Sequence, residues 1–127
     1  MIEQKNLTPS QLKYLLKMSE MDYSGHGIRC IDLASSLGIA KSSVHNMIKT
    51  FVELGYVSKN ENGIAFFTDY GCEAAVRYNR YYSAILSILK KSFPEIEDTD
   101  GIACHIISEM SIDNLEKLSE CYNNHLR

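Results

Sequence analysis

The chain has 127 residues, enough for one or two small domains, and 45% of them are hydrophobic, so a real core can form. Two prolines, seven glycines and the lack of any repeat exclude long linkers and low-complexity segments. The net charge of −3 does not by itself indicate a nucleic-acid binder, so the distribution of charge has to be considered.

The first element is a helix that begins near residue 9. Thr8, Pro9 and Gln11 supply a hydroxyl cap, a proline at the first helical position and a glutamine three residues after the cap. Apolar residues then recur at helical spacing up to Met21. The sequence predicts a helix over residues 9–21 that supports the motif following it.

Residues 29–59 have the pattern of a helix-turn-helix. Apolar positions follow helical spacing on both sides of Gly38, which divides the run into a short helix and a longer one. Gly38 suits the left-handed end of the first helix, and the small Ala34 allows the helices to cross closely. Ser42 or Ser43 is expected to cap the second helix, with Gly55 closing it after Leu54.

The candidate recognition helix therefore extends from Ser43 to Leu54. Its outward face carries short donors, an amide and cations, which suit phosphates and base edges in a major groove. These predicted DNA-binding residues are Lys41, Ser42, Ser43, His45, Asn46 and Lys49. The alternative is a solvated polar face without a partner.

A β-hairpin is predicted directly after this helix. Residues 56–59 and 64–68 are rich in strand formers, and the intervening Asn-Glu-Asn-Gly supplies turn chemistry. A hairpin at this position is a wing, and residues 28–30 are expected to add a short strand beside it. Lys59, Asn60 and Asn62 are then placed to contact the DNA backbone.

A long helix is predicted over residues 69–91, capped by Thr68 and unbroken until Pro94. Its apolar stripe is longer than a small winged domain can cover. Residues 93–127 add two short helices, the second of them capped by Ser111. These helices cannot enclose a core alone, so we expect a two-fold dimer; the alternative is a monomer in which they fold back on the first helix.

The expected fold is therefore mainly α with a small β-hairpin, a winged helix-turn-helix domain followed by a helical dimerisation domain. We place the domains at residues 1–71 and 72–127, with the long connecting helix in the second. The apolar residues predicted at the dimer interface are Ile85, Leu89, Ile106, Ile112 and Leu115.

Charge differs between the two parts. Residues 29–59 carry four basic against two acidic side chains, whereas residues 93–120 carry eight acids and one lysine. One copy should therefore bind DNA weakly and with strong salt dependence, and a dimer would double its phosphate contacts.

Cysteine usage and the N-terminus indicate a compartment. The four cysteines are scattered without C-x-x-C spacing, which suits reduced thiols in a cytoplasmic protein. The polar start MIEQKNLTPS does not have the pattern of a signal peptide, and no apolar run is long enough for a membrane span.

Taken together, the order of elements and the pattern D-L-A-x-x-L-G-I-x-x-S-S-V resemble the diphtheria-toxin-repressor and manganese-transport-regulator family, in its short two-domain form. Residues 32–44 carry most of the likeness, with Gly55-Tyr56-Val57, Thr68 and Gly71. The resemblance implies a bacterial homodimeric repressor that binds palindromic double-stranded DNA when charged with iron or manganese.

The family's metal ligands are largely missing. The resemblance places them at Lys13, Leu16, Tyr82, Gly101, Cys104 and His105, of which only His105 is a matching residue. Cys104 and His105 are adjacent and point roughly 100° apart on a helix, so they cannot chelate as a pair. We expect no cofactor, with Mn or Fe bound only if the site is rebuilt around His105. His105 is then a core or interface residue, and Cys104 a small buried hydrophobe.

The leading hypothesis is a metal-independent DNA-binding regulator, in which the Lys13 ammonium replaces the metal by pairing with Asp100, or in which Lys13 is simply exposed. A second hypothesis keeps the DNA-binding role but gives the vacated pocket, near Tyr78, Tyr81 and Tyr82, to a small organic effector. A third is a protein-interaction module with a vestigial winged helix. No catalytic motif indicates an enzyme.

Overall fold

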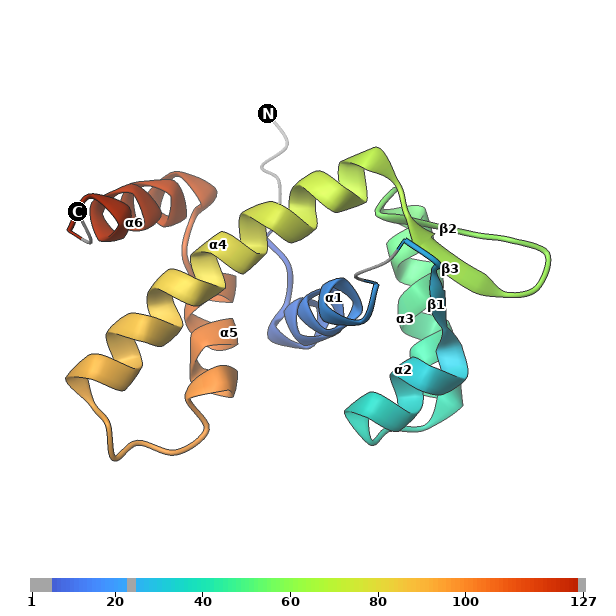
Figure 1. Ribbon diagram of the computed structural model, residues 1–127, viewed down its shortest axis with the longest axis horizontal. Helices are drawn as coiled ribbons and strands as arrows, with labels where there is room; N and C mark the ends of the chain where they lie inside the picture. The colour runs from blue at the N-terminus through green and yellow to red at the C-terminus, as the bar shows by residue number, and fades with distance from the viewer. Residues whose placement is uncertain (1–5, 23–24, 126–127) are drawn as a thin grey trace. The chain divides into compact units, whose positions relative to one another are not determined.

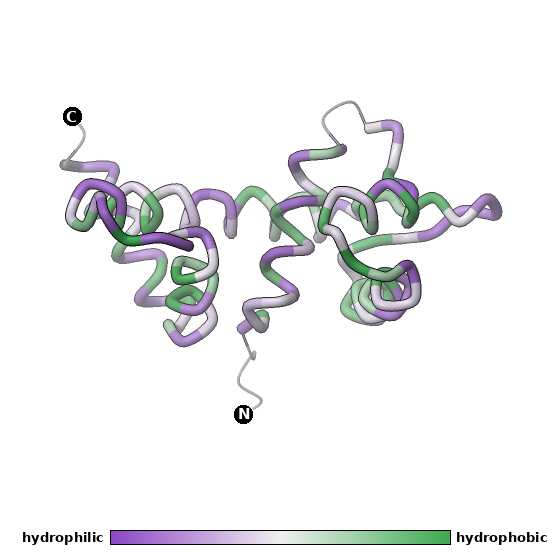
Figure 2. The backbone as a smooth tube through the Cα atoms, turned by 90° about the horizontal axis from the view of Figure 1, so that it is seen from below, coloured by the Kyte–Doolittle hydropathy of each residue, from purple (hydrophilic) through white to green (hydrophobic). Residues whose placement is uncertain are grey.

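The computed structural model of the protein describes residues 6–22 and 25–125 (Figure 1). Along the helices, hydrophobic and hydrophilic stretches alternate, as expected where one side of each helix is buried (Figure 2). The elements in chain order are α1 (Pro9–Met21), β1 (Ile28–Arg29), α2 (Cys30–Leu37), α3 (Lys41–Glu53), β2 (Val57–Lys59), β3 (Ile64–Phe67), α4 (Asp69–Ser92), α5 (Thr99–Glu109) and α6 (Ile112–His125). The mainly helical fold with a winged helix-turn-helix is confirmed, and β1 makes its sheet three-stranded. Within the described residues, no helix is both long and apolar enough to cross a bilayer.

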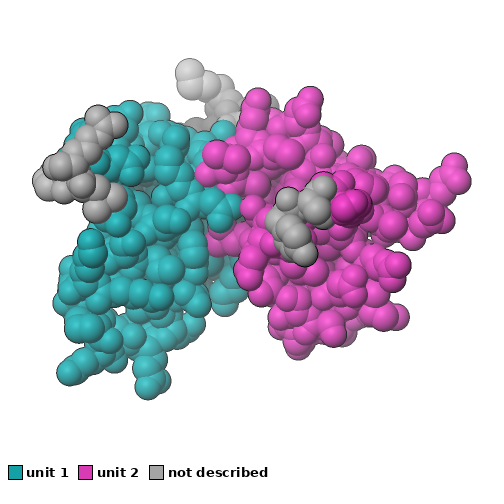
Figure 3. Space-filling view, in the orientation of Figure 1, with its two compact units in different colours: residues 1–13, 77–127 teal, residues 14–76 magenta. Residues whose placement is uncertain are grey.

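The chain divides into two compact units (Figure 3). The winged unit comprises residues 14–76, and the helical unit comprises residues 1–13 and 77–127. Both boundaries fall inside helices, α1 and α4. The division predicted at residue 71 also falls within α4, and the two divisions differ chiefly in where they place residues 1–13.

The helix-turn-helix of the winged unit forms as predicted at its turn. Gly38 ends α2 with a φ of 68°, a left-handed conformation that favours glycine. Ala34 is buried, which lets α2 and α3 approach closely. On α3, Val44, Ile48 and Phe51 are buried and fix which side faces outward.

The predicted serine cap of the recognition helix is wrong. The helix begins at Lys41, two residues earlier than expected, and its N-cap Ala40 makes no side-chain capping bond. The backbone N–H groups of Ser43 and Val44 instead donate to the Ala40 carbonyl, at 3.1 and 3.3 Å. Since both serines lie inside the helix, their hydroxyls are not used as caps.

The wing is an antiparallel sheet in the order β1-β3-β2, with Ala65 buried at its centre. Ala65 pairs with both Ile28 and Lys59, so the central strand β3 links the start of the helix-turn-helix to the wing. At the tip, Oδ1 of Asn60 accepts hydrogen bonds from the N–H groups of Asn62 and Ile64, at 3.0 and 2.9 Å. The turn is therefore held by a side chain as well as by backbone bonds.

The predicted caps of the other helices are confirmed. At α1, the Gln11 N–H donates to Thr8 Oγ1 at 3.1 Å, and the Thr8 N–H donates to Gln11 Oε1 at 3.0 Å, a complete capping box. At α4, Thr68 Oγ1 accepts from the Gly71 N–H at 3.0 Å. At α6, Ser111 Oγ accepts from the Asn114 N–H at 3.1 Å.

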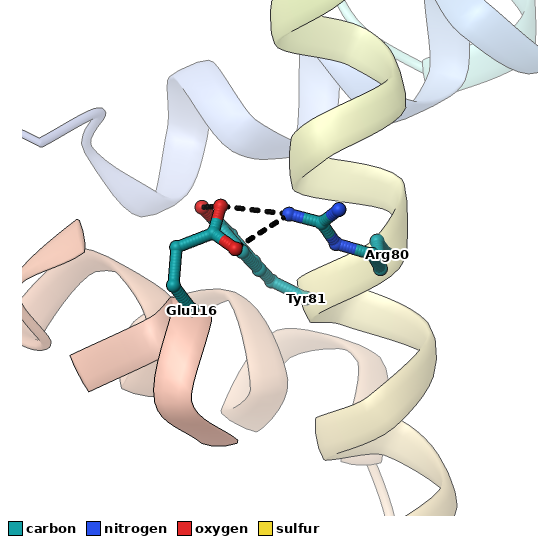
Figure 4. A network of polar contacts seen from close by, with 3 residues as sticks. All are labelled: Arg80, Tyr81 and Glu116. Atoms are coloured by element: carbon teal, nitrogen blue, oxygen red, sulfur yellow. Dashed lines mark hydrogen bonds and ion pairs between the residues drawn. The ribbon is translucent and has the colours of Figure 1, made fainter. Parts of the chain in front are cut away.

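In the helical unit, α4 and α6 are joined by an ionic network (Figure 4). The Arg80 guanidinium lies 2.7 and 2.8 Å from the two carboxylate oxygens of Glu116, and the buried Tyr81 hydroxyl donates to the same carboxylate at 2.5 Å. Arg80 and Glu116 are themselves substantially exposed, so the tyrosine bond is the better shielded part of the network.

A second contact of the helical unit involves Asn6, which the sequence did not single out. Its side-chain nitrogen donates to the carbonyls of Ile107 and Met110 at the end of α5, at 2.6 and 2.9 Å. Its side-chain oxygen accepts from the Tyr78 hydroxyl of α4 at 2.6 Å. One amide therefore satisfies two terminal carbonyls of α5 and links that helix to α4.

The residues predicted for a dimer interface fall into two groups. Ile85 and Leu115 are buried within the chain itself, so in this conformation they have no surface to offer a second copy. Leu89, Ile106 and Ile112 are half-buried and retain apolar surface. Ile85 of α4 and Leu115 of α6 therefore belong to the core of the subunit, because each lies on the inward side of its helix.

Candidate nucleic-acid interface

The outward face of α3 is the candidate interface. All six predicted contact residues on and beside the recognition helix are exposed: Lys41, Ser42, Ser43, His45, Asn46 and Lys49. Because Val44, Ile48 and Phe51 anchor the opposite side, this polar face cannot turn inward without unpacking the helix-turn-helix. The side chains that the sequence nominated are thus presented together on one face of the winged unit.

Two of these residues, Lys41 and His45, do more than face solvent. They lie one helical turn apart and line a hollow of about 500 Å³ between the helix-turn-helix and the wing. We call this the wing hollow. Its lining residues are Arg29, Cys30, Ile31, Lys41, His45, Asn62, Gly63 and Ile64.

Sequence reasoning did not nominate Arg29 as a site residue. Arg29 is exposed at the end of β1, and it reaches the wing hollow because β1 pairs with β3, where Arg29 stands opposite Ile64. No local pattern signals this position, since the pairing joins segments more than thirty residues apart. The nearest signal in the sequence was its basic charge just before the helix-turn-helix.

The residues predicted on the wing differ in how available their side chains are for a DNA contact. Lys59 and Asn62 are exposed, and Asn62 lines the wing hollow. Asn60 is also exposed, but its side-chain oxygen is committed to the turn, which leaves only its amide nitrogen for a partner. Asn60 therefore has a structural role in the wing in addition to its predicted contact.

The positions that correspond to the family's metal ligands carry a different chemistry. The Tyr82 hydroxyl of α4 donates to Asp100 Oδ1 of α5 at 2.8 Å, so this carboxylate already has a partner. Lys13 is exposed, and within the described residues it forms no ion pair, with Asp100 or with any other acid. The pairing of Lys13 with Asp100 is therefore wrong for this structure, and the simpler expectation of an exposed lysine is right.

Gly101 has a geometric reason to lack a side chain. Asp98, with a φ of 54°, caps α5 by accepting from the Gly101 N–H at 3.3 Å. A Cβ at Gly101 would come within 2.7 Å of the Asp98 carboxylate. The residue that caps the helix therefore takes the space that a side-chain ligand would need.

Cys104 and His105 lie on different sides of α5. Cys104 is buried, and burial raises the pKa of its thiol, with Asp100 and Asp98 acting in the same direction and Lys13 in the opposite one. His105 is exposed, so it is not a core histidine of this chain.

Leu16 is aliphatic and belongs to the winged unit. In the described ranges, no three His, Cys, Asp or Glu side chains are grouped so as to hold a metal ion. These residues do not suit Mn(II) or Fe(II), which need several converging nitrogen or oxygen ligands.

Comparisons with known proteins support the fold described above. The model of the IclR helix-turn-helix domain matches residues 25–61, which include β1, α2, α3 and β2. IdeR of T. acidophilum aligns over 96% of this chain and 56% of its own, with 22% identity and a TM-score of 0.68. The manganese regulator SloR aligns over 92% of this chain and 55% of its own, with 20% identity and a TM-score of 0.75. The fold is that of these regulators.

The likeness is one of architecture. A hypothetical protein from Sulfolobus solfataricus aligns over 90% of this chain and 88% of its own, with 24% identity and a TM-score of 0.61. The chain thus spans little more than half of IdeR and SloR but most of this third protein. A search of curated proteins finds no match. The predicted resemblance to metal-dependent repressors is confirmed at the level of the fold.

Proposed function

We propose that this protein is a DNA-binding transcription regulator, a repressor that binds a palindromic operator as a homodimer without needing a metal ion. The observation that carries the proposal is the outward face of α3, where six polar side chains are presented on a helix anchored by Val44, Ile48 and Phe51. A helix with this geometry, followed by a wing, suits insertion into a major groove. The regulators IdeR and SloR, which share the fold, support this assignment.

Charge and apolar surface support the proposed homodimer. Residues 29–59 carry only two more basic than acidic side chains, so one copy would make few phosphate contacts. The helical unit retains half-buried Leu89, Ile106 and Ile112 and exposes Phe93 and Ile96. Pairing of two copies through these side chains would cover apolar surface and join two recognition helices in one molecule, as binding to an inverted repeat requires.

Metal independence is supported by the side chains at the family's ligand positions. Asp100 is bonded to Tyr82, Gly101 has no side chain, and Cys104 is buried with a raised pKa. Binding without a cation then requires that the fold alone holds the two α3 helices at a spacing compatible with DNA.

A selection from random duplexes tests the proposal. The full chain is incubated with a library of random 24-bp duplexes in the presence of EDTA, bound DNA is enriched over several rounds, and the winning sequence is tested by gel shift. We expect an inverted repeat bound with equal affinity in EDTA and in added MnCl2. If no sequence is enriched, DNA recognition is excluded; if EDTA abolishes binding, metal independence is excluded.

The oligomeric state is measured in the same preparation by light scattering. We expect twice the 14.4 kDa mass of one chain. Ile106→Glu should shift the protein to a monomer that keeps its helical circular dichroism but loses the operator, whereas the exposed Ser83→Glu on α4 should leave both unchanged. A wild-type monomer that still binds an inverted repeat would contradict the homodimer.

A further inference from the structure

We infer that the wing hollow seats a phosphate of the DNA backbone, and that base recognition falls to the neighbouring side of α3. This inference rests on the proposed function and adds to it which residues hold the DNA backbone and which recognise the bases. Lys41 and His45 would anchor the duplex, whereas Ser42, Ser43 and Asn46 would read its sequence.

The first argument is the chemistry of the hollow. Arg29 and Lys41 bring two positive charges, and His45 and Asn62 bring further hydrogen-bond donors. None of the described residues that line it is acidic. Asp32 lines a second hollow, which Arg29 and Ile64 also line. A site with cations and neutral donors and without carboxylates favours an anion, and a guanidinium matches a phosphate in two-point geometry.

The second argument is how the hollow is built. Its residues come from β1, the start of α2, the start of α3 and the tip of the wing, all within the winged unit. Arg29 is the N-cap of α2 and makes no side-chain capping bond, and Asp32 lies in the first turn of the same helix, so the positive charge of the hollow comes from side chains. The four segments thus bring the cationic side chains of Arg29 and Lys41 together with the neutral donors His45 and Asn62.

The third argument is position. Lys41 and His45 are one turn apart and both line the hollow, whereas Ser42, Asn46 and Lys49, which are exposed on the same helix, do not. If a backbone phosphate is held between the wing and α3, the side chains of Ser42, Asn46 and Lys49 remain available to contact base edges in the major groove. Asn46 is then the residue best suited to a base edge, because an amide can bond adenine at two points.

Free phosphate and the phosphate of a duplex share this chemistry. We commit to the duplex because the hollow adjoins the exposed polar face of α3, with Lys41 and His45 belonging to both. Its volume of about 500 Å³ and its open form accommodate a phosphate that remains attached to its two sugars.

The test measures salt dependence on a duplex of random sequence, on which nearly all affinity comes from phosphates. Binding of a fluorescent random-sequence 24-bp duplex is followed by anisotropy as KCl is raised, for wild type, Arg29→Gln and Lys41→Gln. Each variant should bind more weakly. The plot of log K against log [KCl] should become less steep by about 1 per hollow, hence by about 2 for a dimer. Lys91→Gln, an exposed lysine on α4, is the charge-matched control and should leave the slope unchanged.

Two further variants separate anchoring from reading. Asn62→Ala should weaken binding without changing the slope, because it removes a neutral donor. Asn46→Ala should keep the wild-type salt slope, because it removes no charge, but should lower the preference for the selected operator over the random duplex. If Arg29→Gln and Lys41→Gln retain the wild-type slope, the inference is overturned while DNA binding stands. If wild type fails to bind the random duplex even at low salt, the proposed function itself fails.

A titration with inorganic phosphate completes the test. It is titrated at constant ionic strength while the backbone amide signals of Lys41, Asn62 and Gly63 are followed by NMR. We expect these signals to shift with the duplex and not to saturate with inorganic phosphate at millimolar concentration. Saturation by inorganic phosphate alone would make the hollow a site for a free anion and would overturn the assignment to DNA.

Discussion

The Tyr82 hydroxyl donates a hydrogen bond to Asp100 Oδ1 at 2.8 Å, joining α4 to α5 at the place where the resembling family has metal ligands. A carboxylate that accepts from a phenol is already oriented and partly satisfied. Of the helices that carry these positions, α4 and α5 are here linked by the protein's own side chains.

We therefore expect the thermal unfolding midpoint to be insensitive to manganese. A ligand that binds only the folded state at a hundredfold excess over its Kd would stabilise it by about 2.7 kcal/mol. Differential scanning fluorimetry with MnCl2, and with FeSO4 under anaerobic conditions, should give the same midpoint as MgCl2 and as EDTA. A rise specific to manganese or iron would show that a site is rebuilt around His105.

Replacement of Asn46 by alanine should reduce sequence selectivity more than affinity. Asn46 is exposed on α3 outside the wing hollow, so its loss removes base contacts but no phosphate contact. We expect about 1–3 kcal/mol less discrimination between the selected operator and a scrambled duplex. The measurement is the ratio of the two dissociation constants at one salt concentration. Lys91→Gln on α4, outside the candidate interface, is the control and should leave the ratio unchanged. An unchanged ratio for Asn46→Ala would contradict its reading role.

Tyr81 makes the stability of the helical unit depend on alkaline pH. Burial, followed by its hydrogen bond to Glu116, raises the pKa of the Tyr81 hydroxyl from 10.0 to about 12. The unfolded chain then releases this proton before the folded chain does, so the contribution is fully present below pH 10 and is lost between pH 10 and 12. The difference between these two pKa values corresponds to about 2–3 kcal/mol of unfolding free energy.

Urea unfolding at a series of pH values measures this effect. Between pH 9 and pH 12 the free energy of unfolding should fall further in wild type than in Tyr81→Phe. At neutral pH the variant should lose only about 1 kcal/mol, because Arg80 still pairs with the Glu116 carboxylate. Parallel pH profiles for the two proteins would refute the raised pKa.

Gly71 should not tolerate alanine. A Cβ at this position would overlap the backbone carbonyl of Tyr56 and press on the Phe67 ring. Since the carbonyl belongs to the chain entering the wing, either α4 or the wing has to move, at a cost of roughly 2–3 kcal/mol or more. Thermal and urea unfolding of Gly71→Ala measure the loss. Ser83→Ala, exposed in the same helix, should change stability by less than about 0.5 kcal/mol.

Local signals in the sequence were sufficient to predict the helices, strands and turns. The Thr8 and Gln11 capping box, the left-handed Gly38, the Asn60 turn and the Thr68 cap each act over a few residues, so composition and spacing reveal them. The same reasoning erred at Ser42 and Ser43, because Ala40 carries the cap geometry without any side-chain bond.

Only the tertiary structure decided which side chains meet. The wing hollow brings together Arg29, Lys41 and Asn62 through the pairing of β1 with β3, and Asn6 reaches the end of α5 across a hundred residues of chain. Leu115 fits an interface pattern and a core pattern equally well, and its burial within one subunit was settled by packing. Periodicity places a residue on one side of its own helix, whereas its partner depends on how distant elements pack, and that packing leaves no local trace in the sequence.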